Sequence, residues 1–137
     1  MPVALEKLVG WAADDARRRG FHSVGIYHLM WACRELDGEE FDRWMGLYQV
    51  EPPAFVKMLE AVLRPRRAGG GLPRDREDAE SLDQLLVQAR KLAAAAGVPG
   101  TSVHLGPAFA VLKQDPFVQL CERFSLRYRA PEKGAAA

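Results

Sequence analysis

The same pattern of residues occurs twice in this chain, and that repetition constrains the fold more than any single motif. Small and apolar residues recur at an offset of 77 positions, the distance from Gly20 to Gly97. The first set is Leu5, Leu8, Ala12, Ala16 and Gly20, and the second is Leu82, Leu85, Ala89, Ala93 and Gly97. Spacings of three and four residues put each set on one face of a helix that ends at its glycine. The repetition therefore predicts two copies of one helical unit.

The match between the two copies extends past each glycine. Residues 26–32 correspond to residues 105–111 at an offset of 79. A later pair of segments, 41–50 and 117–126, corresponds through its apolar residues at an offset of 76. We expect the differences in offset to lie in turns, where changes of length are tolerated.

The apolar spacing predicts helices throughout both copies. Those of the first copy cover residues 3–19, 26–36, 39–48 and 54–63, and those of the second cover 81–96, a segment that starts at Pro107, and 116–124. No segment alternates apolar and polar residues over the length of a strand. The predicted fold class is therefore all-α, with two pseudo-twofold-related helical-bundle repeats. The second copy lacks a counterpart of the fourth helix, so either the C-terminal tail supplies a degenerate one or that repeat is shortened.

The domain organisation follows from the length and from one glycine-rich stretch. A chain of 137 residues suits one compact domain, or two small repeats that share a core. We interpret residues 1–126 as a single domain with a first repeat at 3–63, a flexible linker at 64–80 and a second repeat at 81–126. The linker prediction rests on three glycines between two prolines, without apolar periodicity. Residues 127–137 are expected to form a flexible tail.

The charge balance argues against binding through a global electrostatic field. Nineteen Lys and Arg residues against eighteen Asp and Glu residues give a formal net charge of +1, so a partner has to be recognised by a local surface. Three basic clusters, Arg17–Arg19, Arg64–Arg67 and Arg127–Arg129, make a helical nucleic-acid-binding protein the alternative function. We favour their interpretation as helix-end and linker cations, because an acidic stretch at 75–78 closely follows the second cluster.

The cysteines and the N-terminus indicate the compartment. Cys33 and Cys121 fall on apolar helix faces, without a CxxC pair, and are predicted to be reduced core residues. The first residues lack the pattern of a signal peptide, and no apolar run approaches the roughly 18 residues that a membrane helix needs. We therefore expect a cytoplasmic protein that makes no membrane contact.

Motifs for catalysis, metal binding or cofactor binding are missing. His22, His28 and His104 have no further ligands at the spacing that zinc requires. We expect His28 to be a buried, hydrogen-bonded residue at a helix start and the other two to lie in loops. The three glycines at 69–71 lack the lysine and hydroxyl residue of a phosphate-binding loop, and no nucleophile elbow is present. The expectation is no enzymatic activity, no catalytic residue, no metal and no cofactor.

The paired pattern resembles the Clp N-terminal domain, the double repeat found on the Clp unfoldases of the AAA+ superfamily. That repeat has alanines at four-residue spacing, a glycine, a short loop and a helix that starts around His-Leu-Leu. The first copy has these features at Ala12, Ala16, Gly20 and residues 24–29, and the second has them more weakly within 85–108. The resemblance covers about residues 5–126.

The resemblance implies a peripheral docking module without ATPase activity of its own. Such domains recruit substrates, adaptors or the sheath proteins of type VI secretion, and an attached or associated Clp-type unfoldase, protease or secretion machine does the work. The expected partner is therefore a protein, in the setting of protein quality control or secretion, and not a nucleic acid.

This chain departs from the family at one motif. In many members a Thr-Glu pair precedes each histidine, and the glutamates belong to a site that reads phosphorylated arginine. Tyr27 and Gly106 stand at those positions here, and Pro107 stands in place of the second histidine. A guanidinium ligand is therefore not expected, whereas the ring of Tyr27 offers an aromatic contact for an apolar helix or peptide.

Three residues are the candidates for partner contact. We expect Val3, Tyr27 and Leu86 to line a groove between the two long helices, where an amphipathic partner helix would lie.

Overall fold

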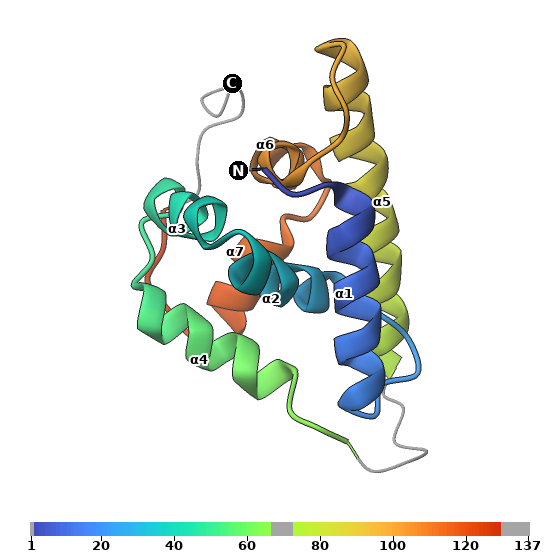
Figure 1. Ribbon diagram of the computed structural model, residues 1–137. Helices are drawn as coiled ribbons and strands as arrows, with labels where there is room; N and C mark the ends of the chain where they lie inside the picture. The colour runs from blue at the N-terminus through green and yellow to red at the C-terminus, as the bar shows by residue number, and fades with distance from the viewer. Residues whose placement is uncertain (1, 67–72, 130–137) are drawn as a thin grey trace.

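The computed structural model describes residues 2–66 and 73–129, and their regular structure is helical (Figure 1). In chain order the elements are α1 (Leu5–Arg18), α2 (Ile26–Leu36), α3 (Gly38–Leu47), α4 (Pro52–Val62), α5 (Pro73–Ala95), the short 3-10 helix η1 (Ser102–His104), α6 (Leu105–Val111) and α7 (Pro116–Arg123). Within these two segments no strand is present, and the extended pairing is limited to an isolated bridge between Ala4 and Thr101. The all-α prediction is confirmed.

The observed helix bounds follow the apolar spacing closely, with one clear exception. The predicted helix at 26–36 coincides with α2, and most other ends agree within two residues. The long helix α5, however, begins at Pro73, so residues 73–80 are helical and were wrongly assigned to a linker. Proline is tolerated in a first helical turn, and the polar residues that follow form pairs such as Arg76 with Glu80 at 3.3 Å.

Two predicted segments lie partly beyond the described residues. The linker residues 67–72 and the tail residues 130–137 are outside them. The first three tail residues, 127–129, form no helix, but the N–H of Arg129 donates to the carbonyl of Tyr48 at 2.7 Å. The chain after α7 is therefore attached to the end of α3 as far as it is described.

Helices α1 and α5 end in the same hydrogen-bonded turn. Gly20 has a φ of +83° and Gly97 a φ of +68°, the left-handed conformation that glycine adopts without a steric cost. In each turn the N–H of the residue after the glycine donates to the carbonyl five residues back, at 2.9 Å in the first copy and 3.1 Å in the second. This is the Schellman arrangement, which the two glycine stops predicted.

The next helical segment begins with the same cap in both copies. The Nδ1 atom of His28 accepts a hydrogen bond from the N–H of Gly25 at 2.9 Å, and Nδ1 of His104 accepts one from the N–H of Thr101 at 3.0 Å. His28 is buried at a helix start, as predicted, whereas His104, expected in a loop, closes the turn of η1. The two histidines are structurally equivalent, at an offset of 76.

The offset of 79 predicted for this segment is therefore wrong. It would pair Ala32, which is fully buried, with Val111, which is 55% exposed, whereas an offset of 76 pairs Ala32 with the equally buried Ala108. The mismatch arose because Pro107 was taken as a helix start. Because proline has no N–H to donate to the carbonyl four residues earlier, the preceding turn closes as a 3-10 helix before α6 begins.

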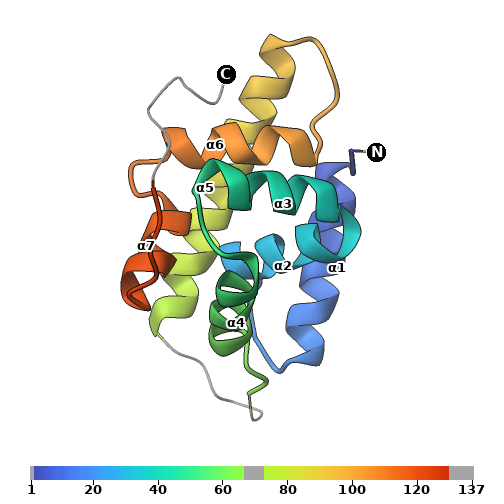
Figure 2. The ribbon, with the colours of Figure 1, turned by 90° about the vertical axis from the view of Figure 1, so that its left-hand side faces the viewer.

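Residues from both copies form one hydrophobic core. Figure 2 shows α2 in the middle of the helices, and it packs against α1, α3, α4 and α5. On α7, the ring of Phe117 is stacked between Tyr48 and Phe55 at centroid distances of 4.0 and 4.3 Å. Trp44 meets Phe109 edge-on at 5.1 Å. The buried cluster is continuous across the copies, so they share a core.

A series of buried hydrogen bonds links the segment before α1 to the starts of η1 and α3. The N–H of Ser102 donates to the carbonyl of Val3 at 2.8 Å, and the N–H of Val3 donates back to Oγ of Ser102 at 3.0 Å. Oγ of Ser102 donates in turn to Oδ2 of Asp37 at 2.5 Å. The second carboxylate oxygen of Asp37 caps α3 by accepting from the N–H of Glu40 at 3.3 Å. Ser102 thereby holds the start of η1 against the start of α3.

Candidate functional site

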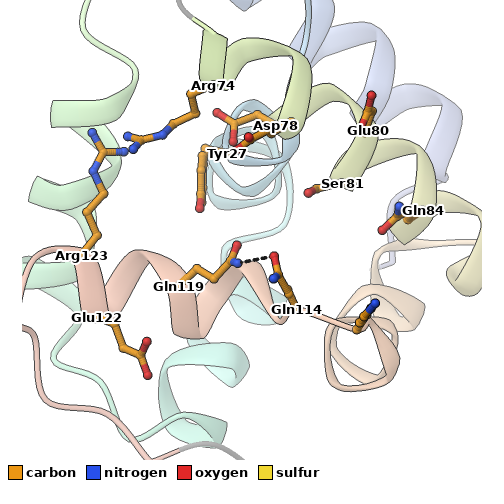
Figure 3. Close-up of a pocket in the computed structure, with 12 residues that line it drawn as sticks. Tyr27, Arg74, Asp78, Glu80, Ser81, Gln84, Gln114, Gln119, Glu122 and Arg123 are labelled. Atoms are coloured by element: carbon orange, nitrogen blue, oxygen red, sulfur yellow. Dashed lines mark hydrogen bonds between the residues drawn. The ribbon is translucent and has the colours of Figure 1, made fainter.

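A polar hollow of about 760 Å³, which we call the recess, lies between the first half of α5, the α6–α7 loop and α7 (Figure 3). The wall on α5 is formed by Arg74, Glu77, Asp78, Glu80, Ser81 and Gln84. The facing wall is formed by Lys113, Gln114, Gln119, Glu122 and Arg123. Tyr27, from the first turn of α2, completes the lining. Its size is in the range of pockets that hold small ligands or peptide side chains.

Tyr27 lies at the back of the recess and is almost entirely buried. Its hydroxyl donates to the carbonyl of Pro116 at 3.4 Å, so the side chain links α2 to the start of α7. Burial raises the pKa of the phenol well above its usual value, and the neighbouring Asp78 carboxylate raises it further. The hydroxyl therefore remains a neutral donor at physiological pH.

Asp78 lies on the α5 wall directly against the start of α2. A Cβ atom added to Gly25 would come within 2.7 Å of the Cβ of Asp78, so glycine at this position lets the two helices approach closely. Burial raises the pKa of the Asp78 carboxyl to about 6, an effect that Arg74 opposes and Asp75 reinforces. The charge of this carboxylate is therefore sensitive to mild acidification.

Two arginines meet at one end of the recess. Arg74 lies in the first turn of α5 and Arg123 is the last residue of α7, and Figure 3 shows their side chains pointing toward one another. Within the described part of the chain, neither guanidinium forms an ion pair, although Arg123 also lies over the ring of Phe124 at 5.4 Å.

Amide and hydroxyl groups occupy the other end. Nε2 of Gln119 donates to Oε1 of Gln114 at 2.7 Å, and Ser81 and Gln84 lie across from them on α5 (Figure 3). Each carboxamide has N–H donors and a carbonyl acceptor, and the Ser81 hydroxyl can both donate and accept. The carboxamide and hydroxyl groups at this end can therefore bind both donors and acceptors of a ligand.

The sequence analysis named Tyr27 as a contact residue in a groove between the two long helices, and it named none of the other residues that line the recess. Arg74, Asp78 and Ser81 are spaced by four and three residues, so they share one face of α5. The spacing of this polar stripe could have predicted that a helix with one polar face begins before residue 81. The linker assignment obscured it, because it ended the helix before the stripe began.

The three predicted contact residues do not form an exposed surface. Leu86 and Tyr27 are 7% and 8% exposed and belong to the core, and Val3 is partly buried against it. Aspartate at Leu86 or Tyr27 would place a charge in the core, so loss of binding by such variants would report unfolding. A role of these three residues in partner binding stays a prediction.

The groove between the two long helices exists but has other walls. A hollow of about 660 Å³ separates α1 from α5, and its lining includes Ala13 and Arg17 on one side and Ala79 and Asp83 on the other. None of the three predicted residues lines it. A hollow therefore lies between the two long helices with a lining other than the predicted one, and its use as a docking groove stays a prediction.

The histidine equivalence also revises the comparison of the two motifs. With His104 aligned to His28, the residue opposite Tyr27 is Val103 and not Gly106. An aromatic and an aliphatic side chain thus precede the two histidines, and neither copy has a carboxylate there.

The first basic cluster and part of the second form ion pairs with nearby carboxylates. The residues Arg17–Arg19 pair with Asp14 and Asp15, at distances from 2.7 to 3.8 Å. Arg66 pairs with Asp75. In the third cluster Arg127 and Arg129 are exposed, and Arg67 lies outside the described residues. An ion-paired guanidinium must give up its carboxylate to bind a phosphate, so it contributes less binding free energy. These contacts therefore weaken the nucleic-acid alternative.

The described residues contain neither a metal-binding cluster nor a membrane-spanning helix. They contain no group of three or more His, Cys, Asp or Glu side chains that could hold a metal ion. Cys33 and Cys121 are buried as free thiols, and burial raises the pKa of Cys121 to about 11. No helix in the described segments combines the length and apolar character that a bilayer crossing requires.

Comparison with protein-family models, with curated proteins and with solved structures finds no match to this chain.

Proposed function

We propose that this protein is a non-catalytic docking module of the Clp N-terminal type, with two pseudo-twofold-related helical repeats. It acts in the cytoplasm and recruits a substrate, an adaptor or a sheath protein to a Clp-type AAA+ unfoldase, protease or secretion machine. The ATP-driven work is done by that partner.

The observation that supports this proposal most is the repeated geometry at equivalent positions. Each copy has a long helix that ends in a left-handed glycine, and a following segment that is capped by a histidine at its third position. The glycine that ends the long helix in both copies, and the histidine at the next helix start in the first copy, are features on which the resemblance to the Clp repeat rests. The cap at His104 adds a second histidine where the sequence comparison had placed Pro107.

The recess supports a binding role at the junction of the two copies. It combines Tyr27 from the first copy with side chains of α5 and α7 from the second. Its charged and amide groups suit reversible recognition of a polar partner. General acid–base chemistry needs groups positioned around a reacting atom, and no such constellation is recognisable among the residues that line the recess.

Capture of partners from a native cell extract tests the proposal. The purified chain is immobilised, exposed to extract at low and at high salt, and the retained proteins are identified by mass spectrometry. Two variants on exposed positions of α5 accompany it: Gln84→Trp, which fills the recess, and Lys91→Trp, which lies outside it.

The expected result is salt-resistant recovery of a Clp ATPase, its protease or a secretion-sheath subunit. The wild type and Lys91→Trp should recover it, and Gln84→Trp should not. Salt-sensitive recovery of nucleic acid in place of a protein would overturn the proposal in favour of the basic-cluster alternative. Equal recovery by both variants would place the docking surface away from the recess.

A further inference from the structure

Arg74 and Arg123 form a cationic pair at one end of the recess. Their side chains come from different helices and point toward one another (Figure 3). Two like charges held in a concave surface repel one another, and the repulsion is relieved when an anion lies between them. Planar guanidinium groups bind carboxylates and phosphates through paired hydrogen bonds, so the pair is suited to an oxyanion.

Two cations near Arg74 in the sequence, Arg66 before α5 and Arg76 on it, already have partners. Arg66 pairs with Asp75, and Arg76 pairs with Glu80 at 3.3 Å. Arg74, between them in the sequence, has no carboxylate within ion-pair distance among the described residues. The charge of Arg74 lowers the pKa of the Asp78 carboxyl, but the two side chains form no ion pair. Arg74 is therefore available to a ligand.

The overall charge of the recess argues against a polyanion. Four carboxylates and three cations line it, so its sum is slightly negative. A nucleic-acid strand, with a phosphate at every nucleotide, would meet those carboxylates along its length. A ligand with one anionic group can lie between the two arginines, where Asp78 is the carboxylate close to Arg74, without extending past the other carboxylates.

The amide-lined end of the recess matches a peptide backbone. Each peptide unit presents one N–H donor and one carbonyl acceptor. Gln84 on one wall and the hydrogen-bonded pair of Gln114 and Gln119 on the other provide both kinds of group. An inorganic anion could accept hydrogen bonds from the carboxamide N–H groups but would make no use of their carbonyl oxygens.

We infer that the recess binds an extended peptide segment whose carboxylate lies between Arg74 and Arg123 and whose backbone runs toward Gln84 and Gln119. This inference rests on the proposed docking function and defines what is docked. The carboxylate is either the C-terminal one or that of an Asp or Glu side chain, since both present the same two oxygens.

Affinity selection from peptide libraries tests the inference. Random hexapeptides with free C-termini, and the same library with amidated C-termini, are passed over the immobilised full chain, and the retained peptides are quantified by mass spectrometry. The double variant Arg74→Gln, Arg123→Gln removes the cationic pair, and Arg90→Gln is the matched control, because Arg90 is exposed on α5 outside the recess. Circular dichroism checks that each variant is folded.

The expected result is retention by the wild type and by Arg90→Gln, with retention lowered about tenfold or more in the double variant, as for loss of a charged hydrogen-bonded contact. Retention confined to the free-acid library identifies a C-terminal carboxylate. Retention of amidated peptides that contain Asp or Glu identifies a side-chain carboxylate.

Two results would overturn the inference, and neither would by itself overturn the docking function. One is equal retention of peptides by the wild type and the double variant. The other is no peptide retention by a wild-type chain that still captures a protein from extract and loses it through Gln84→Trp. In that case the recess recognises a folded surface.

Discussion

The two helix-ending glycines show how one local motif has different consequences in two parts of the molecule. Gly20 and Gly97 both adopt left-handed φ values and both end a long helix in the same turn. A Cβ atom on Gly20 would lie 2.4 Å from the carbonyl oxygen of Arg66, whereas one on Gly97 would have no atom within 4 Å. The sequence motif thus determines the turn, and the neighbouring chain determines how strictly glycine is required.

The capping histidines differ in the same way. His28 is 4% exposed, whereas His104 is only partly buried, although each makes the same hydrogen bond to its cap residue. His28 lies close to Val62 and Leu63 at the end of α4 and to Asp75 and Asp78 on α5, whereas His104 lies nearer the surface. Equivalent substitutions in the two copies should therefore have unequal effects.

The largest difference is expected for alanine at the two glycines. Gly97→Ala should lower the free energy of unfolding by about 1–2 kcal/mol, the cost of a left-handed conformation for a residue with a Cβ. Gly20→Ala should lose that amount and about 1–3 kcal/mol more, because the methyl group overlaps a backbone carbonyl that cannot move freely. Urea denaturation followed by circular dichroism measures both. Equal losses would show that the segment around Arg66 does not pack on Gly20 in solution.

The second difference concerns the response to acid. Burial lowers the pKa of His28 to about 4 from its usual 6.5, and Asp15 partly opposes this effect. Between those values the unfolded chain binds a proton that the folded chain does not, so stability is full above pH 6.5 and is lost as the pH falls toward 4. The contribution is at most about 3 kcal/mol.

Glutamine substitutions isolate that contribution. Glutamine at the third helical position can still accept from the cap N–H. We expect His28→Gln to lose less stability than the wild type between pH 7 and pH 4, whereas His104→Gln, with His28 intact, should follow the wild type. Urea midpoints at several pH values supply the comparison, and an unchanged acid response in His28→Gln would contradict it. The Asp78 carboxyl, whose raised pKa has the opposite effect on stability, is common to all three proteins.

The smallest difference is expected at the hydroxyl groups that link the copies. Ser102 donates to the capping carboxylate of α3, and Tyr48 donates to Asp115, which caps α7, both at 2.5 Å. Ser102→Ala should cost about 1–3 kcal/mol, because it leaves buried polar groups without a partner. Tyr48→Phe should cost about 0.5–1.5 kcal/mol, because water can reach the partly buried Asp115. Thermal unfolding of both variants tests this order, and a larger loss for Tyr48→Phe would reverse it.

Much of the fold could be predicted because apolar spacing reports which face of a helix is buried. The stripe of Leu5, Leu8, Ala12 and Ala16 is buried in full, as is its counterpart in α5. The start of α5 was missed because residues 73–80 are polar on nearly every side, so they carry no apolar period. Their helix is supported by polar pairs, which a search for apolar spacing does not detect.

The candidate site was less predictable than the fold. Tyr27 was predicted as a contact residue from its place before a histidine, and both Tyr27 and Leu86 proved to be buried, although Tyr27 also lines the recess. The converging pair of Arg74 and Arg123 is separated by nearly fifty positions, and nothing in the sequence near either residue refers to the other. Their proximity depends on how α5 and α7 are placed around Tyr27.

The sequence by itself determined that this chain is helical, that its pattern of small and apolar residues recurs, and where most of its helices end. These properties depend on interactions between residues a few positions apart, which periodicity and glycine stops express directly. The tertiary structure alone decided which histidines are equivalent, which glycine has no room for a side chain, and which charged groups share the recess. Those properties depend on contacts between distant segments, and such contacts leave no regular spacing in the sequence.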